Sequence, residues 1–152
     1  MKTKFTASGK QRGVTLLELM IVVAIISMIA AFAYPSYTQY IVNTKRTAAT
    51  STLLQIADRQ QQFFMDNKRY ANNLTDLGLG ANPLWVSGDG SAVPAGDADA
   101  VYIFAVVGVA ATTYTAIAAP LGQQLARDSK CGAMTLNQAG ARQAYGGGDD
   151  CW

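Results

Sequence analysis

Residues 13–34 read GVTLLELMIVVAIISMIAAFAY, and this apolar stretch decides the class of the protein. From Leu19 to Thr44 the chain carries no charged residue. A helix that begins at Val14 is therefore long enough to cross a bilayer, which takes about 20 residues. Four basic residues precede the stretch: Lys2, Lys4, Lys10 and Arg12. Since basic residues mark the cytoplasmic end of a membrane span, we expect the rest of the chain to be exported.

The composition indicates a folded protein whose two charge signs nearly balance. The 152 residues fit one domain, or one domain with an appendage, and 50% apolar against 14% charged residues is too apolar for a disordered chain. Residues 14–152 contain eight basic and ten acidic residues, so the basic character belongs to the N-terminal tail. A protein that grips phosphate groups needs the opposite distribution, and nucleic acid is therefore not expected as the main ligand.

The scarcity of reactive side chains excludes several function classes. The sequence has no histidine, which excludes Ser-His-Asp and Cys-His nucleophile systems and every histidine-containing metal site. Its two cysteines, Cys131 and Cys151, favour a disulfide and hence an oxidising compartment. We expect no enzymatic activity, no metal site and no cofactor. The loop carboxylates are interpreted as solvated groups rather than as calcium ligands: Asp97, Asp99, Asp149 and Asp150.

Three common interpretations of the apolar stretch are a secretory signal peptide, a plain membrane anchor and a buried helix of a soluble protein. The small residues at 31 and 33 even offer a signal-peptidase site. Glu18 argues against all three, because a carboxylate within an apolar span costs roughly 2.5–3.5 kcal/mol and no basic residue stands beside it. This carboxylate therefore needs a partner.

A cut after Gly13 would supply that partner. The new α-amine on Val14 is positive near neutral pH and lies about 6 Å from Glu18 along a helix. The positive end of the helix dipole also favours an anion in the first turn. Such a cut leaves the apolar helix at the N-terminus, whereas signal peptidase removes it.

These residues resemble a known motif. Residues 13–26, GVTLLELMIVVAII, are similar to the class III signal of type IV pilins and pseudopilins. The resemblance implies that a prepilin peptidase cuts after Gly13 and methylates Val14, and that Glu18 is needed for assembly. The family usually has phenylalanine where this chain has Val14, which is also apolar.

The helix is expected to continue beyond the apolar stretch. Pro35 should kink it, because proline lacks an N–H group and clashes with the preceding turn. Beyond Pro35, apolar residues recur every three or four positions up to about Lys68, which predicts an amphipathic half-helix packed on a sheet. About 50 residues of helix span roughly 75 Å, more than a small domain covers, so the apolar half should protrude. The predicted core stripe consists of Tyr37, Ile41, Ala48, Ala49, Leu53, Ile56, Ala57, Phe63 and Phe64.

Charged and aromatic residues after Pro35 suggest how the helix leaves the membrane. Lys45 and Arg46 are interpreted as part of its solvated face. Three tyrosines at the exit are interpreted as an interfacial belt, as packing residues between subunits, or as both at different stages: Tyr34, Tyr37 and Tyr40. For Trp85 and Trp152, an exposed contact and a core anchor are both open interpretations.

The rest of the chain predicts a small antiparallel sheet. Residues 71–100 are rich in Gly, Asn, Asp, Ser and Pro and are expected to be mostly loop. Residues 101–109 and 113–119 form one predicted hairpin, and residues 134–136 and 142–144 form a second. The predicted fold class is α+β, a pilin fold with a long helix on about four strands. Its expected parts are a removed leader (1–13), an apolar half-helix (14–36), an amphipathic half-helix (37–70) and a head (71–152).

The C-terminal region carries a second resemblance. A disulfide between Cys131 and Cys151 would fix the glycine-rich residues 146–150 and contribute about 3 kcal/mol in the chain-entropy model. Pilins have a C-terminal region bounded by a disulfide. The motifs similar to those of type IVa minor pilins are YTAIAAP (114–120), RD (127–128), CG (131–132), TLNQAG (135–140) and DCW (150–152).

The resemblance implies a structural subunit of a type IV pilus, of the minor-pilin branch, that serves twitching motility, adhesion or DNA uptake. Such a subunit waits in the inner membrane, with its N-terminus cytoplasmic and its head periplasmic, before it joins the extracellular filament. Its expected partners are membrane lipid, major and minor pilins, the prepilin peptidase and methyltransferase, and the inner-membrane assembly machinery. One alternative is a type II secretion pseudopilin, which typically uses calcium rather than a C-terminal disulfide. Another is a membrane-anchored periplasmic binding or enzymatic domain.

Overall fold

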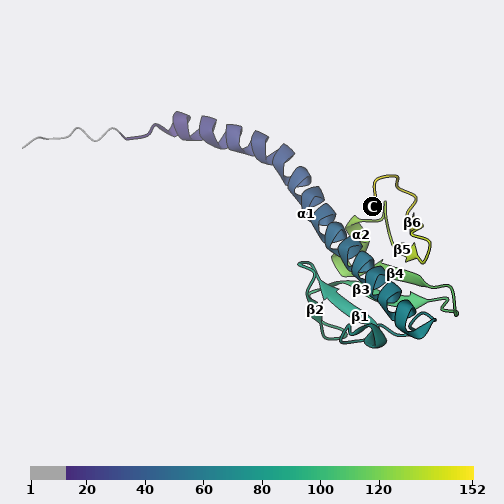
Figure 1. Cartoon of the computed structure of the whole chain (residues 1–152). Helices are drawn as coiled ribbons and strands as arrows, with labels where there is room; N and C mark the ends of the chain where they lie inside the picture. The colour runs from purple at the N-terminus through teal and green to yellow at the C-terminus, as the bar shows by residue number, and fades with distance from the viewer. Residues whose placement is uncertain (1–12) are drawn as a thin grey trace, which may run out of the picture. The chain divides into compact units, whose positions relative to one another are not determined.

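The computed structural model of the chain describes residues 13–152 (Figure 1). The predicted leader lies outside the described residues except for Gly13. The elements are one long helix, a 3-10 turn, a short helix and six strands. In chain order they are α1 (Leu16–Asn67), η1 (Thr75–Leu77), β1 (Leu84–Ser87), β2 (Ala92–Val93), β3 (Ala100–Val107), β4 (Thr115–Pro120), α2 (Gly122–Arg127), β5 (Met134–Asn137) and β6 (Arg142–Ala144). The predicted α+β class, a long N-terminal helix and an antiparallel sheet, is confirmed.

The described residues form two compact units, one ending at Thr38 and the other running from Gln39 to Trp152. In the first unit, α1 holds the one stretch of residues 13–152 that is long and apolar enough to cross a membrane. Pro35 lies inside the helix, and the kink expected there stays a prediction. The Ser27 hydroxyl donates to the carbonyl oxygen of Val23 at 2.8 Å, so this polar side chain is satisfied within the helix.

The second unit contains a six-stranded sheet in the order β2-β1-β3-β4-β5-β6, with every pair antiparallel. The two predicted hairpins are β3–β4 and β5–β6. The sheet has two strands more than predicted, because β1 and β2 lie in the segment expected to be mostly loop. β1 has only four residues and follows a proline, so its sequence pattern is weak. Its hydrogen-bond partner is the longest strand, with Trp85 opposite Ile103.

The core lies between the sheet and the part of α1 that belongs to the second unit (Figure 1). Alternation along the strands buries Tyr102 and Phe104 on β3. The helical stripe is largely as predicted: Ala49, Leu53 and Ile56 are buried, and Ala57, Phe63 and Phe64 are partly buried against the same core. Tyr37 was predicted in this stripe, but its side chain is 64% exposed.

The turn after α1 is fixed by one buried side chain. Gln60 accepts a hydrogen bond from the N–H of Ala71 and donates one to its carbonyl oxygen, both at 2.9 Å. Both residues are fully buried. Lys68 ends the helix in the left-handed region, with a φ of 57°. The chain thus reverses direction at the position where the amphipathic pattern ends.

The two outer strands of the sheet differ in their protection. β2 has only two residues. On β6, the carbonyl oxygen of Gln143 accepts a hydrogen bond from the indole N–H of Trp152 at 3.1 Å. Trp152 also packs against the core and is partly buried, which favours the anchor interpretation for this residue.

Candidate functional site

The predicted processing and assembly residues lie at the start of α1. Gly13 and Val14 precede the helix, and the Val14 side chain is 71% exposed. The Thr15 hydroxyl oxygen accepts a hydrogen bond from the N–H of Glu18 at 3.2 Å, which caps the helix. Glu18 occupies the first turn, where the helix dipole favours a carboxylate. The local geometry is that of a capped helix whose first turn presents one exposed acid.

A continuous apolar surface follows Glu18. Large side chains are exposed along the helix from Leu16 to Tyr34, including those of Leu19, Ile25, Ile29 and Phe32. An exposed apolar surface of this extent is not stable in water and marks a membrane or protein contact. The part of α1 that lies in the first unit therefore presents a surface for lipid or for other protein chains.

The C-terminal region is closed by the predicted disulfide. Cys131 and Cys151 are bonded, with their Cα atoms 5.4 Å apart, and both are buried. Backbone hydrogen bonds hold the glycine run that lies between the two cysteines. The N–H of Gly146 donates to the Cys131 carbonyl oxygen, and that of Gly148 to the Lys130 carbonyl oxygen, both at 2.9 Å. A Cβ atom on Gly146 would lie 2.4 Å from the Lys130 carbonyl oxygen, so only glycine fits there.

A buried ion pair joins α1 to this region, and it corrects one prediction. Arg46 does not lie on a solvated face, because its side chain is only 12% exposed and that of Asp128 only 1%. Its Nε and Nη2 atoms donate to the two carboxylate oxygens of Asp128. Its Nη1 atom donates to the carbonyl oxygen of Asp150 at 3.2 Å. The hydrogen bond to Asp128 raises the pKa of the Arg46 guanidinium.

Two further buried side chains complete the network around Asp128. The Gln124 amide nitrogen lies 3.1 Å from a carboxylate oxygen of Asp128, 3.1 Å from the Tyr102 hydroxyl and 3.2 Å from the Val42 carbonyl oxygen. Burial raises the pKa of Tyr102 to about 12, so its hydroxyl stays a donor toward Asp128. Local sequence patterns do not reveal this network, because Arg46 and Asp128 lie 82 positions apart along the chain.

The surface of the C-terminal region combines basic and aromatic side chains. The guanidinium carbon of Arg142 lies 5.4 Å from the centre of the Trp152 ring, within cation–π range. The Tyr145 side chain is 71% exposed, and Lys130 is exposed as well. We call Lys130, Arg142, Tyr145 and Trp152 the basic–aromatic surface.

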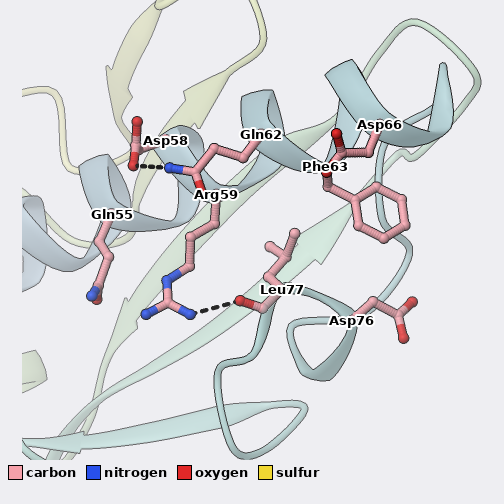
Figure 2. Close-up of a pocket in the computed structure, with 8 residues that line it drawn as sticks. All are labelled: Gln55, Asp58, Arg59, Gln62, Phe63, Asp66, Asp76 and Leu77. Carbon is pink, nitrogen blue, oxygen red and sulfur yellow. Dashed lines mark hydrogen bonds between the residues drawn. The ribbon is translucent and has the colours of Figure 1, made fainter.

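A polar groove lies between α1 and η1, with a volume of about 430 Å³ (Figure 2). Two of its polar side chains donate to other groups that line it. Arg59 donates to the Leu77 carbonyl oxygen at 2.7 Å, and Gln62 donates to Asp58 at 2.8 Å. Within residues 13–152, no three His, Cys, Asp or Glu side chains gather closely enough to hold a metal ion. We assign no chemistry to this groove.

A capped apolar helix with an acid in its first turn, followed by an α+β head closed by a C-terminal disulfide, defines a type IV pilin subunit. Residues 35–135 match the family model "Type IV minor pilin ComP, DNA uptake sequence receptor", and residues 8–34 match the "Prokaryotic N-terminal methylation motif". Since the first match covers more than half of the chain, this protein belongs to the ComP family of type IV pilins. It is a family of structural subunits, not of enzymes.

Curated relatives include several major pilins. The chain is 37% identical over 70 residues to "Type IV major pilin protein PilA" of Myxococcus xanthus, covering 46% of this chain and 32% of the relative. It is 49% identical over 55 residues to "Type IV major fimbrial protein FimA" of Dichelobacter nodosus, covering 34% of each chain. It is 33% identical over 82 residues to "Type IV major pilin protein PilE1" of Neisseria gonorrhoeae, covering 51% of this chain and 47% of the relative. Each match spans less than half of the relative.

Proposed function

We propose that this protein is a minor subunit of a type IV pilus, cut after Gly13, methylated at Val14 and polymerised through the apolar part of α1. The observation that carries the proposal is a single charge, that of Glu18, on an exposed helix surface that is otherwise uncharged from Gly13 to Thr44. Before assembly the helix lies in the inner membrane, with its start on the cytoplasmic side and the head in the periplasm. The family match to a minor pilin supports the minor role.

Glu18 sets the register of the assembled helices. Apolar contacts are non-directional, so the side chains that follow Glu18 hold subunits together at many staggers. A stagger that separates Glu18 from the α-amine of a neighbouring Val14 leaves a buried charge without a partner, which costs about 3–5 kcal/mol. The pair therefore selects one stagger mainly by penalising the others.

The test separates insertion, processing and assembly. Glu18→Ala should insert into the inner membrane and be cut after Gly13, yet be depleted from sheared pili. Ser27→Ala, a small change on the same helix, is the matched control and should be incorporated normally. Normal incorporation of Glu18→Ala would refute the charge-pair role. The amount of wild-type protein relative to the major subunit in sheared pili tests the minor role.

Processing is tested on the mature protein itself. Its N-terminal residue should be N-methylated Val14, by mass spectrometry of material from the native envelope. A chain that starts at Met1 or Tyr34 would instead indicate an uncut anchor or an ordinary signal peptide. Gly13→Ala should be processed nearly normally, whereas Gly13→Phe should accumulate as the precursor.

Contact with DNA is a second candidate function of the head. The family description names a DNA uptake sequence receptor, and the basic–aromatic surface offers Arg142 and Lys130 for phosphates, together with the exposed ring of Tyr145 and the partly buried ring of Trp152. Residues 39–152 contain eight basic and nine acidic residues, so any attraction of DNA must come from this local surface rather than from net charge.

The DNA function is tested by the binding of labelled duplex DNA to the full chain in detergent. Arg142→Ala should weaken binding and make it less dependent on salt. Arg69→Ala is the matched control, because Arg69 also lies over an aromatic ring, that of Phe63, but outside the basic–aromatic surface. Equal effects of the two variants, or no binding by the wild type, would remove this candidate while leaving pilus assembly untouched.

A further inference from the structure

Arg46 contacts the chain beside each of the two cysteines. Its guanidinium holds the carboxylate of Asp128, three residues before Cys131. Its third nitrogen donates to the carbonyl oxygen of Asp150, the residue before Cys151. One side chain on α1 thus binds both segments that the disulfide joins. Arg46 itself is not part of the apolar core, although Tyr102, which contacts Asp128, belongs to that core.

Other contacts of the same region do not involve the sulfur atoms. The amides of Gly146 and Gly148 donate to the backbone carbonyl oxygens of Cys131 and Lys130. These two bonds hold residues 146–148 against the turn that contains Lys130 and Cys131. The Gln124 amide also donates to the Oδ2 atom of Asp128, so that Arg46 meets an oriented carboxylate. We call Arg46, Asp128 and the Asp150 carbonyl group the Arg46 clamp.

We propose that the Arg46 clamp holds the two thiols side by side before they are oxidised, which makes Arg46 a positioning residue for disulfide formation. The loop between the cysteines spans 20 positions of sequence, and an unclamped loop of this length brings its ends together only occasionally. The clamp is intramolecular and raises the effective concentration of one thiol at the other. This inference does not depend on pilus assembly or on DNA.

The chemical step is thiol–disulfide exchange with an external disulfide, as an oxidising compartment supplies. The thiolate of one cysteine attacks the external disulfide, forms a mixed disulfide and releases one external thiolate. The thiolate of the second cysteine then attacks the protein sulfur of the mixed disulfide and displaces the other external thiolate. The protein loses two electrons and two protons, and the external disulfide is reduced to two thiols. The clamp acts on the second attack, which joins two positions of the same chain.

The experiment uses the full chain in detergent micelles. The reduced protein is equilibrated with mixtures of oxidised and reduced glutathione, quenched with acid, and its free thiols are counted by a maleimide mass tag. The ratio of oxidised to reduced protein at each glutathione composition gives the effective concentration of one cysteine at the other. Arg46→Met should lower it by about tenfold or more. Arg127→Met, which removes an exposed arginine next to Asp128, is the matched control and should leave it unchanged. Arg46→Lys should give an intermediate value, because one ammonium cannot hold both partners.

Two results would overturn the proposal. The first is an Arg46→Met effective concentration equal to that of the wild type in the folded state. In denaturing urea all variants should agree, which shows that the difference comes from folded contacts. The second result does not require Arg46→Met to fold. In the Cys131→Ser/Cys151→Ser variant, the clamp should keep the amides of Gly146 and Gly148 protected from hydrogen exchange. Loss of that protection would show that the disulfide holds the loop and the clamp does not.

Discussion

Replacement of Gln60 by leucine tests how the head is held on the helix. Leucine keeps the apolar bulk of the side chain and removes both polar atoms. In the native protein these atoms satisfy the N–H and the carbonyl group of Ala71, at 2.9 Å each. Gln60 and Ala71 are both fully buried, so water cannot replace the lost partner. The substitution therefore leaves two buried backbone groups without hydrogen bonds.

The expected cost follows from those two groups. Each buried donor or acceptor left without a partner costs about 1–3 kcal/mol, so Gln60→Leu should lower the free energy of unfolding by about 2–6 kcal/mol. Gln62→Leu is the matched control, with the same substitution two residues further on an exposed face. It removes only a hydrogen bond to Asp58 along the helix, worth about 0.2–0.5 kcal/mol.

Urea unfolding of the full chain in detergent measures both variants, with near-ultraviolet circular dichroism as the signal of tertiary packing. Helical content is a poor signal here, because we expect the apolar part of α1 to stay helical in detergent. A difference between the two variants of less than about 0.5 kcal/mol, the spread of ordinary surface substitutions, would refute the role assigned to Gln60.

Three further predictions concern the head. Gly146→Ala should lower the melting temperature far more than Gly147→Ala. A Cβ at Gly146 would lie 2.4 Å from backbone oxygens, whereas a Cβ at Gly147 meets nothing within 4 Å and adds only left-handed strain. Equal shifts in melting temperature would contradict this. Burial raises the pKa of Tyr102 and Tyr114 to about 12, so these two tyrosines should ionise last in an absorbance titration. Since the unfolded pKa is about 10, their contribution to stability is complete below about pH 10 and is lost as the pH rises toward 12. Asn137→Ala should cost about 1–3 kcal/mol in urea unfolding, since the Asn137 oxygen accepts two backbone N–H groups of the β5–β6 turn.

The elements that the sequence predicted best are those with long local patterns. The apolar stretch and the stripe after it predicted a helix from Val14 to about Lys68, and α1 runs from Leu16 to Asn67. β3 and β4 are adjacent runs rich in β-branched and aromatic residues, so their pairing could be inferred from the sequence. In both cases the information lies within the segment itself.

The elements and contacts that the sequence did not predict depend on distant partners. β1 is too short to stand alone and forms because β3 offers its edge. α2 has six residues and is fixed by Gln124, whose buried amide reaches α1 and β3. The Arg46 clamp was missed for the same reason, since its residues are 82 positions apart along the chain. Arg46 follows Lys45 on a helix, and this local sequence does not indicate that the Arg46 side chain is buried.

The outer strands of the sheet bear on how the protein behaves before it polymerises. An unpaired strand edge is a template for uncontrolled β-pairing between molecules crowded in one plane. Here the edge strand β2 is only two residues long. On the other edge strand, β6, the indole N–H of Trp152 donates to the carbonyl oxygen of Gln143. These two features leave little free strand edge for pairing between heads, so we expect self-association to occur through the apolar surface of α1. A variant that lacks this terminal indole should aggregate through its heads.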